Sequence, residues 1–166
     1  MLKVCIQTVC IQTMADTSLN ENRISILIRQ ISNLWHSKLR KLLKEYQISI
    51  NEYLILETIY HLSNVNSSYD ITQTLISNES TVDYSVVSIK ILSLEKNKYI
   101  EKVNSFNSRS NKIEITKLGI DLVLKIINDV QKEEDFLFQK LGVEKNNFIN
   151  TLRLILGKKI RIKVNK

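Results

Sequence analysis

Proline is absent from this sequence, and glycine occurs only three times, at Gly119, Gly142 and Gly157. Because these two residue types are the strongest breakers of regular structure, their scarcity favours long helices. No apolar run approaches the roughly 18 residues that a membrane-spanning helix needs. The N-terminus lacks the basic start, apolar stretch and cleavage site of a signal peptide. We therefore expect a largely helical cytoplasmic protein that does not enter a membrane.

Cysteine and histidine are also scarce, with two residues of each type. Cys5 and Cys10 are five residues apart, outside the spacing of paired zinc cysteines, and His36 and His61 lie on separate segments. The sequence has no phosphate-binding loop and no serine, histidine and aspartate order that suggests a catalytic triad. We therefore expect a protein that is not an enzyme and has no metal and no cofactor.

The residues that are abundant are typical of a globular protein with a basic surface. The 166 residues are 43% hydrophobic and 25% charged, and this length suits a single domain. The formal charge of +7 fits a polyanionic partner, although an ordinary basic surface has the same composition.

Two long segments in the first half of the chain have the signals of helices. Apolar residues recur at three-and-four spacing through residues 19–46, which keeps one helical face apolar. Ser49 and Glu52 are three residues apart and form a capping box, so a second helix is expected to begin near Ile50.

Two further helices are expected after the turn at residues 63–68. Asp70 is the expected cap of a short helix over residues 71–80, and Asp83 that of a longer helix over residues 84–98. In the longer helix, the spacing turns three residues inward, namely Val87, Ile91 and Leu94. The same spacing turns five residues toward other faces, namely Ser85, Val86, Ser88, Ile89 and Ser93.

The hydrophobic period then changes from that of a helix to that of a strand. The segments YIEKVN and NKIEIT alternate apolar with polar residues on either side of the polar loop SFNSRS, which predicts a β-hairpin. Thr116 is the expected cap of a helix over residues 117–141, and a last helix is expected at 144–156. Helices followed by a two-stranded hairpin are the order of a winged helix-turn-helix, a fold that is mainly α with a small β wing.

Residues 50 to about 120 resemble the MarR family of bacterial transcription regulators. The wing of that family reads Asp-x-Arg, five residues, an apolar residue, threonine, two residues and glycine. In the stretch NSRSNKIEITKLG the same spacing places Asn107, Arg109, Ile115, Thr116 and Gly119 at these positions. The segments DITQTLI and VSIKILSLEKNKYIEK resemble the short helix and the recognition helix of the family.

The resemblance implies a single MarR-like domain at residues 19–166, with a winged helix-turn-helix at about 50–118. Long helices at 19–46 and 117–157 would form a homodimer, and residues 158–166 would be a basic tail. Two positions depart from the family. The aspartate of the wing is Asn107, and the glycine after the recognition helix is Lys98, so Asn97 is expected to supply the left-handed turn there.

A winged helix-turn-helix places its second helix in the major groove of DNA. Ser85, Ser88 and Lys90 are the polar candidates for contacts with bases there. Val86 and Ile89 are expected to touch thymine methyl groups or, alternatively, to pack against the wing or a neighbouring helix. Arg109 is expected to enter the minor groove, unless it is an ordinary solvated loop arginine. The predicted DNA-binding residues are Ser85, Val86, Ser88, Ile89, Lys90, Asn107, Ser108 and Arg109.

The charge is concentrated away from this predicted DNA-binding region. Residues 67–117 contain seven basic and six acidic residues, a net charge of only +1. Residues 158–166 carry +5, and residues 38–45 carry +3. Because phosphate contacts supply most of the non-specific affinity, one copy is expected to bind weakly, so that two-fold duplication of the site, alone or together with the basic tail, has to compensate.

The family resemblance further implies regulation by a small molecule. Small phenolic or lipophilic ligands release many members from DNA by binding between the dimer helices and the DNA-binding module. Trp35, Tyr53, Tyr60 and His61 are candidates to line such a pocket, although ordinary core or interface residues have the same character.

The first 14 residues contain an internal duplication. Val4 to Thr8 is copied without change as Val9 to Thr13, and Met14 follows. We expect Met14 to be the native start, with residues 1–13 as an upstream extension, and we assign residues 1–18 as a disordered or mis-called N-terminal segment. The alternative is a redox switch at Cys5 and Cys10, since some members of the family sense oxidants through a cysteine near the N-terminus.

The function predicted from the sequence is a homodimeric DNA-binding transcription regulator that acts on a pseudo-palindromic site. The alternative is an interaction protein that keeps the fold and pairs with another regulator without strong DNA binding of its own. A third hypothesis is an amphipathic protein that the tail segment KKIRIK holds to anionic membrane surfaces.

Overall fold

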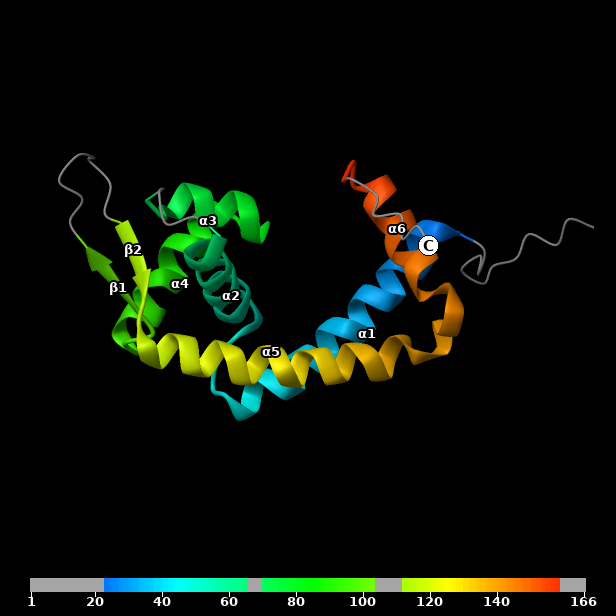
Figure 1. Ribbon diagram of the computed structural model, residues 1–166, viewed down its shortest axis with the longest axis horizontal. Helices are drawn as coiled ribbons and strands as arrows, with labels where there is room; N and C mark the ends of the chain where they lie inside the picture. The colour runs from blue at the N-terminus through cyan, green and yellow to red at the C-terminus, as the bar shows by residue number, and fades with distance from the viewer. Residues whose placement is uncertain (1–22, 66–69, 104–111, 159–166) are drawn as a thin grey trace, which may run out of the picture. The chain divides into compact units, whose positions relative to one another are not determined.

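The computed structural model describes residues 23–65, 70–103 and 112–158 (Figure 1). The chain divides into two compact units, residues 1–37 and 38–166, and helix α1 (Ile24–Glu45) crosses the boundary between them. The second unit contains the remaining elements, which are α2 (Ile50–Val65), α3 (Gln73–Ser80), α4 (Tyr84–Lys96), β1 (Ile100–Val103), β2 (Lys112–Ile115), α5 (Lys117–Phe138), the 3-10 segment η1 (Gln139–Glu144) and α6 (Lys145–Ile155). The expected fold class, mainly α with a small β-hairpin, is confirmed.

Helix α2 begins with the predicted capping box. The backbone N–H of Ser49 donates to Glu52 Oε2 at 2.7 Å, and the backbone N–H of Glu52 donates to Ser49 Oγ at 3.3 Å. Burial opposes ionisation of the Glu52 carboxyl, but hydrogen bonds from Ser49 and Ser93 and the charge of Lys90 hold its pKa below the ordinary value. The box therefore holds a buried carboxylate at the start of the helix and satisfies two backbone donors.

Helix α3 starts later than the sequence suggests, because Thr72 rather than Asp70 is its N-cap. The Thr72 hydroxyl accepts a hydrogen bond from the N–H of Leu75, as an N-cap side chain does. Ile71, between the two candidates, is buried, and its carbonyl accepts a hydrogen bond from the N–H of Ile113 at 2.9 Å. The expectation for Asp70 was wrong because residue 71 uses its backbone to bond strand β2 and cannot begin a helix.

Helix α4 has the predicted start and inner face. Asp83 occupies the N-cap position, but its side chain makes no capping hydrogen bond in the described structure. Val87, Ile91 and Leu94 are buried, as predicted from their spacing. The left-handed residue that follows the helix is Lys98, with φ of 60°, and not Asn97. The expected role of Asn97 is therefore wrong, and a lysine has the conformation that glycine adopts most easily.

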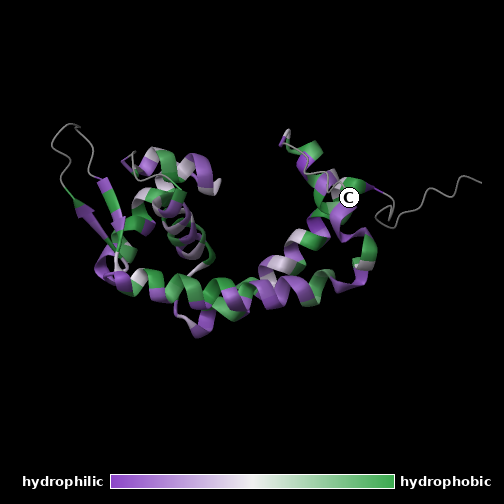
Figure 2. Cartoon of the chain, viewed as in Figure 1, coloured by the Kyte–Doolittle hydropathy of each residue, from purple (hydrophilic) through white to green (hydrophobic). Residues whose placement is uncertain are grey.

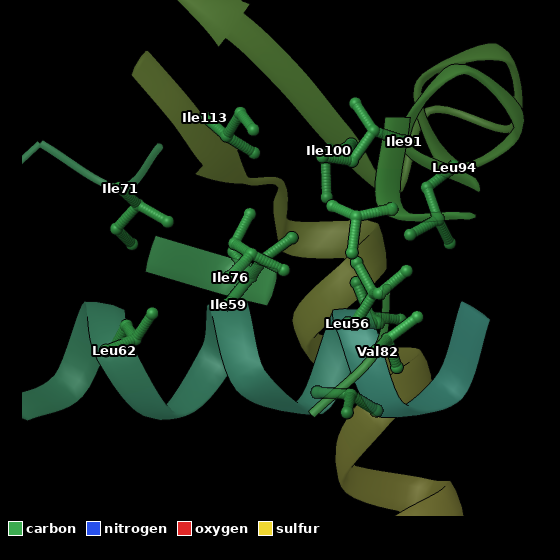
Figure 3. Packing of buried hydrophobic residues seen from close by; sticks show 13 residues of the cluster. Leu56, Ile59, Leu62, Ile71, Ile76, Val82, Ile91, Leu94, Ile100 and Ile113 are labelled. Atoms are coloured by element: carbon green, nitrogen blue, oxygen red, sulfur yellow. The ribbon is translucent and has the colours of Figure 1, made fainter. Parts of the chain in front are cut away.

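The hairpin is antiparallel, with Ile100 opposite Ile115 and Val103 opposite Lys112. Buried Ile100 and Ile113 attach it to the core, which α2, α3 and α4 complete. Figure 3 shows side chains from the three helices and both strands converging in this cluster. We call residues 50–118, which carry these elements, the winged-helix module.

The junction between the hairpin and α5 is built on two residues of the family motif. The Thr116 hydroxyl donates to the carbonyl of Lys98 at 2.7 Å and accepts from the N–H of Gly119 at 3.1 Å. The N–H of Thr116 donates to the carbonyl of Tyr99 at 3.0 Å. These bonds fix the first turn of α5 against the chain that enters β1. Thr116 is therefore the N-cap of α5, as predicted.

The long C-terminal segment is interrupted where one helix was expected to continue to residue 141. Helix α5 ends at Phe138, and η1 contains Gly142 with φ of 49° and ψ of −124°. This conformation is outside the helical range, so α6 starts in a new direction at Lys145. Phe138 and Phe148 pack across the interruption with ring centroids 6.2 Å apart.

Candidate nucleic-acid interface

Helix α4 presents one face to the core and the opposite face to solvent. With Val87, Ile91 and Leu94 buried, helical geometry turns Ser85, Ile89, Leu92 and Lys96 outward. Ile89 is 65% exposed and Leu92 is 59% exposed, and Ser85 and Lys96 are exposed as well. We call these four residues the outer stripe of α4.

Three of the predicted DNA-binding residues of α4 are engaged inside the module. Val86 is half-buried against the core. The Ser88 hydroxyl donates to Gln73 Oε1 on α3 at 2.9 Å, and Lys90 Nζ lies 3.5 Å from Glu52 Oε1 on α2. Of the five candidates on this helix, Ser85 and Ile89 lie on the outer stripe. Whether any of them contacts DNA stays a prediction.

Leu92 was not among the predicted site residues, although its spacing was available in the sequence. It lies seven residues after Ser85 and three after Ile89, which places it on the same face of a helix. Leucine in a predicted helix is normally assigned to the core, so the apolar character of Leu92 favours an inward position that it does not have. The burial of the opposite face identifies it as an outer residue.

The wing tip, with Asn107, Ser108 and Arg109, lies outside the described residues, as do residues 1–22 and residues 159–166 of the basic tail. The described strands place the ends of that loop at Val103 and Lys112, which are paired across the hairpin. The expected minor-groove contact of Arg109 therefore stays a prediction, and so do the expectations for Cys5, Cys10 and Met14.

Ion pairs neutralise part of the positive charge of the module. Lys102 Nζ lies 2.6 Å from Glu95 Oε2, Lys112 Nζ lies 2.9 Å from Glu114 Oε1, and Lys90 is paired with Glu52. Within the described part of the module, the lysines that make no ion pair are Lys96, Lys98 and Lys117. The positive potential that the module offers to phosphate groups is therefore small, in line with its net charge.

A pocket of about 320 Å³ opens between α2, α3 and α5. Its lining residues are Glu57, Thr58, Tyr60, His61, Leu62, Glu79 and Ile127. Tyr60 and His61 line this pocket, and they are two of the four predicted effector-pocket residues. Tyr53 is buried in the core and Trp35 belongs to the first unit, and neither is a lining residue.

Acidic groups dominate the electrostatics next to this pocket. Burial raises the pKa of the Glu57 carboxyl above its ordinary value, although a hydrogen bond from Tyr53 and the charge of His61 oppose this effect. Burial, together with the charges of Glu57 and Asp135, likewise raises the pKa of Glu134 on α5. Burial also raises the pKa of the Tyr53 hydroxyl.

The two glutamates of α2 are expected to change stability in opposite directions with pH. The folded pKa of Glu57 is raised, so the folded state binds its proton more tightly and loses stability as pH rises between the unfolded and folded pKa values. The folded pKa of Glu52 is lowered, so its contribution is present above the unfolded pKa and is lost as pH falls through the folded value.

This difference gives a paired prediction for two neutral substitutions. At pH 7 Glu57→Gln is expected to raise the thermal midpoint, whereas Glu52→Gln is expected to cost about 1 kcal/mol because it weakens the capping box. Both differences should shrink in acid, once the carboxyls of the parent are protonated. Thermal unfolding of the three proteins across acidic to neutral pH measures this, and a loss of stability in Glu57→Gln at pH 7 would contradict it.

The described structure offers little for other kinds of site. Among residues 23–65, 70–103 and 112–158, no three histidine, cysteine, aspartate or glutamate side chains are grouped so that they could hold a metal ion. None of the helices in these ranges is both long and apolar enough to cross a membrane.

The structure is similar to solved structures of bacterial transcription regulators. It matches MepR of Staphylococcus aureus in complex with DNA at a TM-score of 0.71 and 24% identity, covering 83% of this chain and 97% of that chain. A MarR/EmrR family transcriptional regulator from Acinetobacter sp. ADP1 matches at a TM-score of 0.66 and 21% identity, covering 80% and 91%. A MarR family protein from Bacillus stearothermophilus matches at 0.65 and 18%, covering 80% and 90%. No protein-family model and no curated protein matches the sequence.

Proposed function

We propose that this chain, which has the winged-helix fold of the MarR-family transcription regulators, binds double-stranded DNA and regulates transcription. The observation that carries the proposal is the geometry of α4. One face of this helix is anchored in the core through Val87, Ile91 and Leu94, and the opposite face is free. A helix fixed on one side and exposed on the other is what a protein needs to read the major groove.

The wing complements this helix in the proposed complex. Thirteen residues give α4 a length of about 20 Å, enough to cross several base pairs in the groove. The hairpin that follows is anchored in the core by Ile100 and Ile113, and its loop, residues 104–111, carries the predicted minor-groove residues. Arg109 in that loop would enter the minor groove, with Asn107 and Ser108 beside it.

We also propose that the active form is a homodimer on a pseudo-palindromic site. Helix α1 carries five large apolar residues that are 41 to 69% exposed, namely Ile24, Leu27, Ile28, Ile31 and Leu34. Helix α6 separately exposes Ile149, Leu152 and Ile155. The hydrophobic residues of both helices are green in Figure 2. A second copy of the chain is the partner that would bury these faces and hold two α4 helices about 34 Å apart on DNA.

The pocket next to Tyr60 and His61 supports regulation by a small molecule. Its volume of about 320 Å³ lies at the lower end of the range of ligand pockets, and it adjoins both the core of the module and α5. A ligand that binds there in one arrangement of the two α4 helices, and not in the other, would shift the protein away from DNA. Action on DNA implies a cytoplasmic location.

DNA binding is tested by its dependence on salt. We expect the chain to shift upstream DNA of its own gene, with affinity falling between about 50 and 200 mM salt. Arg109→Ala should weaken binding about tenfold and reduce the magnitude of the logarithmic salt slope by about 1 for each copy. Arg40→Ala, which removes an exposed arginine of α1 outside the module, is the matched control and should change binding less.

The second candidate function is an interaction protein that pairs with another regulator without strong DNA binding of its own. The specific observation in its favour is that ion pairs occupy Lys90, Lys102 and Lys112, which leaves the module few positive charges for phosphates. The absence of any shift at low salt, for a chain that is folded and dimeric, would favour this function over the first.

A further inference from the structure

The outer stripe of α4 has an unusual composition for a helix that is proposed to face a polyanion. Its central residues, Ile89 and Leu92, are large, apolar and more than half exposed. Ser85 lies at one end of the stripe, and Lys96 at the other supplies its cation. The basic residue of the same helix closest to the centre, Lys90, is turned toward Glu52.

These side chains restrict what the helix can recognise in a major groove. Guanine is distinguished chiefly by arginine or lysine donating to its N7 and O6 atoms, and adenine by asparagine or glutamine. The centre of the stripe has none of these side chains. The feature of the groove that favours an apolar neighbour is the C5-methyl group of thymine.

Resting on the proposed function, we propose that Ile89 and Leu92 recognise thymine methyl groups, so that the preferred DNA sites contain thymines opposite the centre of α4. The two residues are three positions apart, a rise of about 4.5 Å along the helix. This separation is close to the rise of one to two base pairs, so the contacts fall on neighbouring thymines. Ser85 would hydrogen-bond a base edge beside them.

The charge distribution gives these apolar contacts a larger share of the affinity than usual. Three lysines of the module are held in ion pairs, so the phosphate contribution from each copy is small. Burial of a methyl group is expected to change affinity about fourfold, and two copies of α4 double the number of such contacts in one complex.

The test uses a chemical change in the DNA that leaves the protein untouched. A duplex is first selected by the dimer from a random library, and is then synthesised with deoxyuridine in place of thymidine at the positions opposite α4. Uracil keeps the base pairing and lacks the C5-methyl group. We expect affinity to fall about fourfold for each contacted methyl. Ile89→Ala should lower affinity for the thymine duplex by a similar factor and remove the part of the difference between the two duplexes that its own methyl contact supplies.

A matched protein control is available in Leu118, which is 53% exposed at the start of α5. Leu92→Ala should reduce discrimination between thymine and uracil, whereas Leu118→Ala should leave it unchanged. Equal affinity of the parent for the two duplexes would overturn this inference and leave the proposed function standing. Failure of the dimer to retain any duplex at low salt would overturn both.

Discussion

Alanine at position 119 is expected to destabilise the winged-helix module by about 3 kcal/mol or more. A Cβ atom on Gly119 would lie 2.1 Å from the carbonyl oxygen of Tyr99 and 2.9 Å from Cγ1 of Ile115. The closer contact is with the backbone, which cannot rotate away as a side chain can. Helix α5 would have to move away from the chain entering β1, which would break the hydrogen bond between Thr116 and Tyr99.

Denaturant unfolding of Gly119→Ala and of Gly157→Ala measures this effect against a control. Gly157 has a φ of 65°, and no atom lies within 4 Å of the position of its Cβ, so alanine there meets no clash. Its expected cost is about 1 kcal/mol, from the left-handed conformation alone. A loss in Gly119→Ala no larger than that in Gly157→Ala would contradict the close approach of α5 to Tyr99.

The same pair of residues shows what the sequence was able to predict. The spacing of Thr116 and Gly119 was recognised from the family motif, and the N-cap role of Thr116 followed from local chemistry. The reason for the glycine was not accessible, because the carbonyl that excludes a side chain belongs to Tyr99, twenty residues earlier. Local signals therefore predicted the start of helix α5, whereas the need for glycine at position 119 comes from a long-range contact.

Long-range contacts also account for the wrong helix cap. Asp70 is as good a capping residue as Thr72 by type. The choice between them was made by Ile71, whose carbonyl accepts a hydrogen bond from the N–H of Ile113, in a strand 42 residues later. The left-handed residue after α4 has a similar explanation. Lys98 donates its N–H to Glu95 and Tyr99 donates to Leu94, so the chain turns at Lys98 although Asn97 is the better residue type.

The candidate interface was predicted only as far as helical periodicity reaches. The buried face of α4 was correctly identified from spacing, and so was the outward position of Ile89. The engagement of Ser88 by Gln73 and of Lys90 by Glu52 depends on the packing of three helices, which no local pattern encodes. A polar residue type was therefore a poor guide to which side chains of α4 are free.

Glutamate at position 28 is expected to convert the proposed homodimer into a monomer. Ile28 lies in the middle of the exposed apolar face of α1, and two-fold symmetry places each substitution in the interface twice. Burying an unpaired carboxylate at an apolar contact would cost about 2 kcal/mol for each copy, or about 4 kcal/mol in total. This corresponds to roughly a thousandfold weaker association.

Sedimentation equilibrium of Ile28→Glu and Asn33→Glu tests the interface. Asn33 is exposed on the face of α1 opposite the apolar residues, so it receives the same charge on the same helix without entering the proposed contact. We expect Asn33→Glu to remain a dimer. Circular dichroism should show helix content close to that of the parent for both variants, because the core of the module does not include residue 28. A stable Ile28→Glu dimer would contradict the role of the α1 face.

Loss of the dimer should affect DNA binding far more than loss of any single side chain on α4. Once one copy of a dimer has bound its half-site, the second copy is held near the other half-site at an effective concentration in the millimolar range. The second binding step is therefore strongly favoured. A monomer lacks this advantage, and its affinity for the full site should fall by a factor on the order of 10² to 10⁴. The fall predicted for Ile89→Ala is about fourfold for each methyl contact. Binding of the full site by monomeric Ile28→Glu with the affinity of the parent would show that one copy suffices. In that case the few unpaired lysines of the module and its apolar outer stripe would carry the affinity without duplication.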